Sequence, residues 1–243
     1  MLVGKILCVT GWLLALGLSG WAAPRIYHRF FINRSVVQPE IWRQTLIEKQ
    51  RELSRPWQDH RPLVMLAGDS HVEYGDWYNL FAGNWAVRNC GLARAKIADV
   101  TQLVSAIHVQ PTQTMVLMCG INNLGAGEKP EDCLRDYERL LATVRSRLRP
   151  ESIMVLSVMP LRESLIDRST HEVTRNVGRF NAALKICCEQ EHVLFLNVNS
   201  AVTDARGGLA DHLTEDGLHL NSAGYRRLAS VIAPQLPQPT SQP

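Results

Sequence analysis

Two short segments of the chain carry side chains that could act together as a nucleophile and its base. Ser70 comes just after an apolar run that ends near Gly68, and Asp216 lies three residues before His219 near the other end of the chain. A serine hydroxyl is a weak nucleophile alone and needs a general base within about 3 Å. An aspartate that holds one imidazole nitrogen leaves the other free to take the serine proton. The pairing suggests acyl transfer, although a serine here is also an ordinary helix N-cap.

Two further segments could stabilise the negative oxygen that forms in such a reaction. Gly91 follows a second apolar run, and Asn122 lies two residues after Gly120, which follows a third. A backbone N–H at Gly91 and the side-chain amide of Asn122 are donors of the kind that line an oxyanion hole. Each is ordinary turn chemistry when considered alone. Because the four segments follow four different elements in order, together they favour the catalytic interpretation.

Short apolar runs alternate with helical stretches along most of the chain. The runs have strand length and lack polar alternation, as in strands buried on both faces. They are Leu63–Ala67, Ala86–Cys90, Thr114–Cys119, Ile153–Val158 and Val193–Val198. The clearest helical stretches are Glu131–Leu148, Thr174–Glu191 and Ser222–Ile232. This alternation predicts a parallel sheet between helices, with ligands bound outside the carboxyl ends of the strands, where the candidate residues stand.

The ordered motifs resemble those of the SGNH (GDSL-type) hydrolases over roughly residues 62–232. The four matching blocks are Gly68-Asp69-Ser70, Gly91, Gly120-x-Asn122 and Asp216-x-x-His219. The platelet-activating-factor acetylhydrolase branch looks most similar, because of Asn123, the Met159-Pro160-Leu161 turn and Gly224-Tyr225. The sequence departs from the block name at His71, where the name has leucine, but this position varies in the family.

The resemblance implies an α/β fold, a flavodoxin-like three-layer α/β/α sandwich on a five-stranded parallel sheet, and a serine esterase that forms an acyl-enzyme. Ser70 would be the nucleophile, His219 the general base and Asp216 the carboxylate that orients it. The oxyanion hole would consist of the N–H groups of Ser70 and Gly91 and the amide of Asn122. No cofactor or metal is implied.

Three neighbours of these residues are further candidates. We expect Asp69, His71 and Asn123 to contact the substrate, because each adjoins a catalytic motif. The remaining histidines show no metal-binding spacing, so no metal site is expected.

The first 23 residues are mostly apolar, and Lys5 is their one charged residue. The run from Ile6 to Ala23 is just long enough to cross a bilayer, and it also fits a secretory signal peptide. We expect an uncleaved membrane anchor rather than a cleaved signal, because the sequence around Trp21 makes a poor cleavage site. The arginines after the run favour a cytoplasmic side by the positive-inside rule. A lone signal-like anchor more often exports the domain attached to it, so we expect a periplasmic or extracellular domain.

The rest of the chain divides into a connector at 24–61 with a helix at Pro39–Ser54, a hydrolase domain at 62–235 and a disordered tail at 236–243. A hydrophobic content of 46% supports a folded domain. The net charge of +3, from 26 basic and 23 acidic residues, speaks against a nucleic-acid partner.

We expect the substrate to carry a short O-acyl group, such as acetyl on a glycan or a lipid, since no long apolar lid is visible. The alternative is a domain of the same fold that binds acylated glycan, or assists an acyltransferase, without hydrolysis. The sequence leaves the acyl group, the alcohol and the oligomeric state open.

Overall fold

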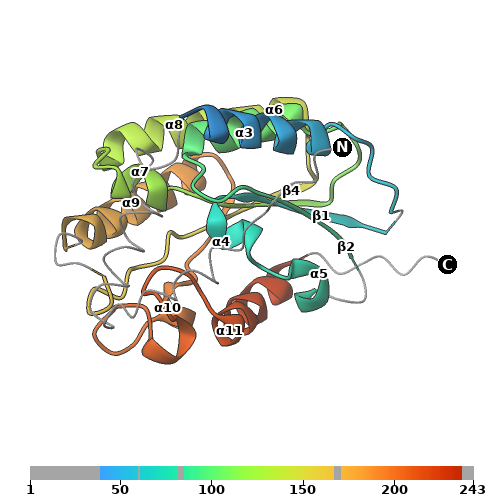
Figure 1. Ribbon diagram of the computed structural model, residues 1–243. Coiled ribbons are helices and arrows are strands. Elements are labelled where there is room, and N and C mark those ends of the chain that lie inside the picture. Colours follow the sequence, from blue (N-terminus) through green and yellow to red (C-terminus); the bar gives the residue numbers. More distant parts are fainter. Residues whose placement is uncertain (1–38, 60, 82–84, 167–170, 237–243) are drawn as a thin grey trace, which may run out of the picture.

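Five parallel strands in the order β2-β1-β3-β4-β5 form the centre of the fold (Figure 1). The computed structural model describes residues 39–59, 61–81, 85–166 and 171–236. The strands are β1 (Leu63–Gly68), β2 (Ala86–Gly91), β3 (Thr114–Met118), β4 (Ser152–Leu156) and β5 (Leu194–Leu196). Each predicted run overlaps one strand, so the predicted α/β class and five-stranded parallel sheet are confirmed.

Both faces of the sheet are covered by helices, as the continuous apolar runs require. Along β1, Met65 and Ala67 belong to one buried cluster, whereas Val64 and Leu66 belong to another. The helices on the first face are α3 (Pro39–Leu53), α6 (Ile97–Ala106), α8 (Pro130–Arg147) and α9 (His171–Gln190). Those on the second face are α5 (Trp77–Leu80), α10 (Asn199–Val202) and α11 (Ser222–Ile232). Figure 1 shows the resulting three layers.

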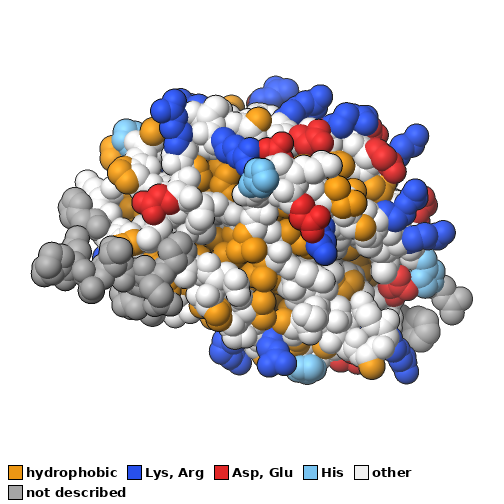
Figure 2. All heavy atoms as spheres, turned by 180° about the vertical axis from the view of Figure 1, so that it is seen from behind, with side chains coloured by type: hydrophobic (Ala, Val, Ile, Leu, Met, Phe, Trp, Pro, Cys, Tyr) orange, Lys and Arg blue, Asp and Glu red, His pale blue; other side chains and the backbone are white. Residues whose placement is uncertain are grey.

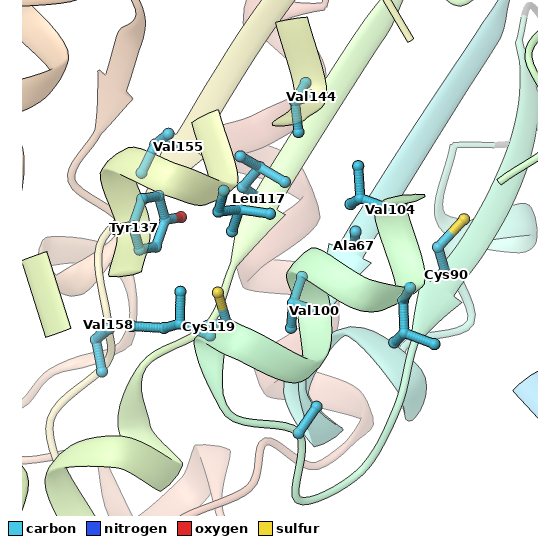
Figure 3. Packing of buried hydrophobic residues seen from close by; sticks show 14 of the residues in the cluster. Ala67, Cys90, Val100, Val104, Leu117, Cys119, Tyr137, Val144, Val155 and Val158 are labelled. Atoms are coloured by element: carbon cyan, nitrogen blue, oxygen red, sulfur yellow. The ribbon is translucent and has the colours of Figure 1, made fainter. Parts of the chain in front are cut away.

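Valines and a tyrosine on α6 and α8 fill the first layer of the core (Figure 3). Tyr137 is fully buried, and Val100 and Val104 belong to the same cluster as Leu117 of β3. The cysteines of the described part of the chain are buried and carry free thiols: Cys90, Cys119, Cys133, Cys187 and Cys188. Burial raises the pKa of the Cys90 thiol to about 12, so this thiol stays protonated and unreactive.

The connector helix α3 packs on the domain. Leu46 and Leu53 of α3 lie in the same buried cluster as β1. From β2, the Arg88 guanidinium donates to the carbonyl oxygens of Glu52, Leu53 and Arg55 at 3.3, 2.9 and 3.2 Å. These carbonyl oxygens lie at the C-terminal end of α3, where no intrahelical N–H donor is available to them. The arginine therefore fixes the end of α3 to the sheet.

The predicted membrane or signal segment, residues 1–23, lies outside the described residues, as does nearly all of the predicted tail. Among the helices of the described part, none is both long enough and apolar enough to cross a bilayer.

Two glycines allow backbone segments to approach closely where the strands end. A Cβ at Gly68 would lie 2.0 Å from the carbonyl oxygen of Met118 in β3. A Cβ at Gly91 would lie 2.4 Å from the backbone nitrogen of Glu73, in the short helix α4 (Ser70–Glu73). Real Cβ atoms do not approach this closely, so any side chain at Gly91 would displace α4 from β2.

Replacing Gly91 with alanine is therefore expected to lower the free energy of unfolding by about 1–3 kcal/mol, the usual range for overpacking. Gly178 in α9 provides a matched control, because a Cβ there would meet no atom within 4 Å. Gly178→Ala should be neutral or stabilising by about 0.5–1 kcal/mol. Urea denaturation of both variants measures the difference. Alanine retains the backbone N–H of residue 91, so the variant tests packing alone. Wild-type stability in Gly91→Ala would therefore contradict the packing role.

Candidate active site

Ser70 lies at the first position of α4, but Asp69 is the residue that caps this helix. The Asp69 carboxylate accepts the backbone N–H of His71 at 3.0 Å. The hydroxyl of Ser70 is thus not needed as a cap. The backbone N–H of Ser70 stands at the helix start, where the helix itself supplies no carbonyl acceptor.

The structure brings Ser70, His219 and Asp216 into a continuous chain of hydrogen bonds. Ser70 Oγ lies 2.8 Å from His219 Nε2, and His219 Nδ1 lies 2.8 Å from Asp216 Oδ2. Because a carboxylate only accepts, Nδ1 carries the ring proton and Nε2 is left to accept the serine hydroxyl. This arrangement can draw a proton from Ser70 when its oxygen attacks an electrophile.

A tight turn places the aspartate against the imidazole. Asp216 Oδ1 accepts the backbone N–H groups of Leu218 and His219 at 2.8 and 2.7 Å. Gly217 has a φ of +82°, and its N–H donates to the hydroxyl of Thr214 at 2.9 Å. A Cβ at Gly217 would also lie 2.8 Å from the carbonyl oxygen of Arg162. The turn therefore requires glycine for its conformation and for its packing.

Asn122 is buried on the short helix α7 (Ile121–Gly125), which follows β3. Its Nδ2 donates to the carbonyl oxygen of Ala95 at 3.0 Å. This contact uses one of the two amide hydrogens and fixes the orientation of the group. The second hydrogen can serve as an oxyanion donor.

Gly91 lies at the end of β2, and its expected oxyanion role stays a prediction. Its N–H already donates to the side-chain oxygen of Asn89 at 2.9 Å. The Asn89 amide in turn donates to the carbonyl oxygens of Val72 and Glu73 at 2.9 and 3.1 Å. Gly91 and Asn89 thus attach the far end of α4 to β2. Asn89 was not among the predicted residues, although a polar side chain near the end of an apolar run could have indicated it.

Asp69, His71 and Asn123 are buried and hydrogen-bonded within the protein, and their expected contact with substrate stays a prediction. Asp69 accepts hydrogen bonds from the backbone and the ring of His71. Asn123 accepts the N–H of Ile97 at 2.9 Å and donates to Glu128 at 2.6 Å. The bond to Ile97 joins α7 to the start of α6.

Tyr74 adjoins the site and was not among the predicted residues. Its ring centroid lies 5.3 Å from that of His219, and 47% of the residue is exposed. It lines a cavity of about 350 Å³ that also contains His219, Glu215 and Ser222. Burial of its inner part raises the pKa of the Tyr74 hydroxyl, so the phenol is neutral at physiological pH. The spacing of four residues from Ser70, which places both on one helix face, was the available signal.

In the described part of the chain, no three His, Cys, Asp or Glu side chains gather as a metal site would require. On the face shown in Figure 2, basic and acidic side chains are interspersed.

Comparisons with known proteins agree with this architecture. The model of the GDSL-like lipase/acylhydrolase family matches residues 66–227. A Streptococcus pneumonia structure, whose description refers to platelet activating factor, aligns at 23% identity and a TM-score of 0.72 over 82% of this chain and 96% of its own. An aryl esterase from M. smegmatis aligns at 15% identity, with a TM-score of 0.59, over 72% of this chain and 97% of its own.

A carbohydrate acetylesterase from Sinorhizobium meliloti also aligns at 15% identity, with a TM-score of 0.57, over 72% of this chain and 98% of its own. At these identities the structural likenesses establish the fold. No curated protein matches the chain. Since the family match spans more than half of the sequence, the chain belongs to the GDSL-like lipase/acylhydrolase family and is a carboxylic ester hydrolase.

Proposed function

We propose that the protein hydrolyses short-chain O-acyl esters, with acetyl as the acyl group, on a glycan or lipid through an acyl-enzyme on Ser70. The observation that carries this proposal is the hydrogen-bonded chain from Ser70 Oγ through His219 to Asp216, with both contacts at 2.8 Å. A serine in such a chain is a nucleophile ready to lose its proton.

In the proposed reaction, Ser70 Oγ attacks the ester carbonyl while His219 Nε2 takes the hydroxyl proton. The carbonyl oxygen becomes negative and meets the N–H of Ser70 and the second amide hydrogen of Asn122. His219 then gives its proton to the departing alcohol oxygen, which leaves Ser70 acylated. A water molecule then attacks the acyl carbon while His219 Nε2 takes its proton, and His219 returns that proton to Ser70 Oγ as the carboxylic acid leaves.

Asp216 supports the positive charge that His219 carries in each step. Its carboxylate accepts Nδ1–H with one oxygen and two backbone N–H groups with the other. Hydrogen bonds to the charged form stabilise a carboxylate. Asp216 therefore orients the ring and remains ionised throughout.

The cavity beside His219 supports a polar alcohol portion in the substrate. The half-exposed ring of Tyr74 provides one wall, and the exposed Glu215 and Ser222 provide hydrogen-bonding groups. A sugar ring would stack on the tyrosine and bond to these groups, whereas a long acyl chain would find few apolar contacts. The structural likeness to a carbohydrate acetylesterase agrees with this assignment. We further propose that residues 1–23 tether the enzyme on the exported side of a membrane.

The Ser70→Ala variant of the full chain is expected to lose more than about 10³-fold in kcat toward p-nitrophenyl acetate, because no other group supplies the nucleophile. Ser105→Ala, at an exposed position on α6, should retain wild-type activity. Unchanged hydrolysis in Ser70→Ala would reject the proposed mechanism. Acyl-glycan binding by a wild-type chain that shows no hydrolysis would favour the non-hydrolytic alternative.

Asp216→Asn should preserve the shape of the turn but lower kcat by about 10⁴-fold, because the amide stabilises the wrong tautomer of His219. KM should change little, since the hydrogen bonds of Asp216 are expected to be the same in the free and the substrate-bound enzyme. Asp132→Asn on the exposed face of α8 is the control. Steady-state kinetics measure the change in kcat. A loss of kcat below tenfold would show that His219 does not depend on this carboxylate.

Tyr74→Ala is expected to lower kcat/KM for an acetylated sugar by about tenfold more than for methyl acetate, because only the sugar reaches the tyrosine wall. Tyr78→Ala is the matched control, since Tyr78 is even more exposed but lies on α5 and does not line the cavity. Equal losses on both esters would remove the support for a glycan.

A further inference from the structure

His71 is buried directly behind the nucleophile with both ring nitrogens facing acceptors. The residue is 3% exposed. Its Nδ1 lies 3.1 Å from Asp69 Oδ1, and its Nε2 lies 3.0 Å from the carbonyl oxygen of Leu218. Carboxylate and carbonyl oxygens accept hydrogen bonds and do not donate them, so a neutral ring could satisfy only one of these contacts. Both contacts are satisfied only when the ring is a doubly protonated imidazolium.

This ring joins the two loops that form the site. His71 follows the nucleophile, and the carbonyl it contacts belongs to Leu218, the residue directly before His219. The rings of His71 and His219 lie 5.4 Å apart, so the base also packs against the side of the buried ring. From α11, the hydroxyl of Tyr225 donates to the carbonyl oxygen of His71 at 3.0 Å. His71 is thus itself held in place.

We propose that His71 is a positioning residue for ester hydrolysis, a buried imidazolium that holds the His219 loop against the Ser70 helix. The proposal rests on the proposed function of Ser70 and His219. The proposal extends that function by assigning a role to His71, where the family's block name has leucine.

The charges around His71 favour its protonated form. Asp69 lies on the turn after β1, Asp216 and His219 on the opposite loop, Tyr225 on α11, and Tyr74 across the ring of His219. Burial by itself lowers the pKa of His71. The bond and charge of Asp69, the Leu218 carbonyl and the charge of Asp216 outweigh it, and the pKa is raised above its ordinary value. The stabilisation is therefore complete below the ordinary histidine pKa and is lost as the pH rises through the raised one.

The first test is the protonation state of the ring in the wild-type full chain. Nitrogen NMR of histidine-labelled protein, with the His71 signal assigned by its loss in His71→Gln, distinguishes an imidazolium from either neutral tautomer. The expected result is a ring protonated on both nitrogens at pH 7, deprotonating only at higher pH. A neutral His71 ring at pH 7 would overturn the proposal. This readout does not depend on activity.

The second test is kinetic and uses a graded pair of variants. His71→Leu removes both donors and should lower kcat at least tenfold with KM within about twofold. His71→Gln keeps an uncharged N–H that can reach the Leu218 carbonyl, so it should recover part of the loss. In a profile of kcat against pH, the wild type should also lose activity at alkaline pH as His71 deprotonates. This alkaline limb of the profile should be missing in His71→Gln. Tyr74→Phe should keep it, which excludes the tyrosine as its source.

His108→Gln, on the exposed surface, is the control for removing a histidine. Wild-type kcat in His71→Leu, or an alkaline limb that persists in His71→Gln, would overturn the proposal. These outcomes are separate from a failure of the proposed function, which would appear as unchanged hydrolysis in Ser70→Ala with the His71 ring still charged.

Discussion

The site depends on a hydrogen bond between residues 149 positions apart in the sequence, Ser70 and His219. A bond of this type contributes only about 0.5–1.5 kcal/mol, which is too little to hold two loops together. The loops must therefore be brought to within 2.8 Å by the rest of the fold. Much of the structure near the carboxyl edge of the sheet can be understood as meeting this requirement.

The nucleophile side is positioned by close backbone packing. Gly68 and Gly91 let α4 lie directly against the ends of β1 and β2, and Asn89 bonds to the far end of the same helix. The base side is held by polar contacts. The N–H of Arg162 donates to the carbonyl oxygen of Gly217 at 2.7 Å, and the Arg162 guanidinium pairs with Asp204 and Asp211. His71 connects the two sides. The reacting groups are thus fixed before substrate arrives, which lowers the entropic cost of reaching the transition state.

Most of the fold could be predicted from the sequence, because strands buried on both faces leave an unmistakable apolar run and the longest helices have a clear period. The strand β5 is shorter than its apolar run suggested, at Leu194–Leu196. The helix α6 was not among the clearest predicted stretches. Its Ile97, Val100 and Val104 are β-branched residues that favour strands, and only the tertiary contacts of its buried face decide in favour of a helix.

The candidate site was predicted less evenly. Ser70, Asp216 and His219 could be named because a nucleophile, a base and an orienting acid have distinctive chemistry and spacing. The hydrogen-bond partners of Gly91, Asp69 and Asn123 could not be predicted, since they depend on which acceptor or donor lies within about 3 Å in the folded chain. His71 illustrates the same limit, because its charge follows from two acceptors, one of which is 147 residues away in sequence.

The most direct test of the proposed catalytic mechanism is to treat the full chain with an organophosphate such as diisopropyl fluorophosphate and locate the adduct by peptide mass spectrometry. A serine becomes rapidly phosphorylated only when a neighbouring base takes its proton. The mechanism predicts one adduct, on Ser70, that forms at least a hundredfold more slowly when His219 is replaced by alanine. An adduct on another residue, or a rate unaffected by His219→Ala, would contradict it.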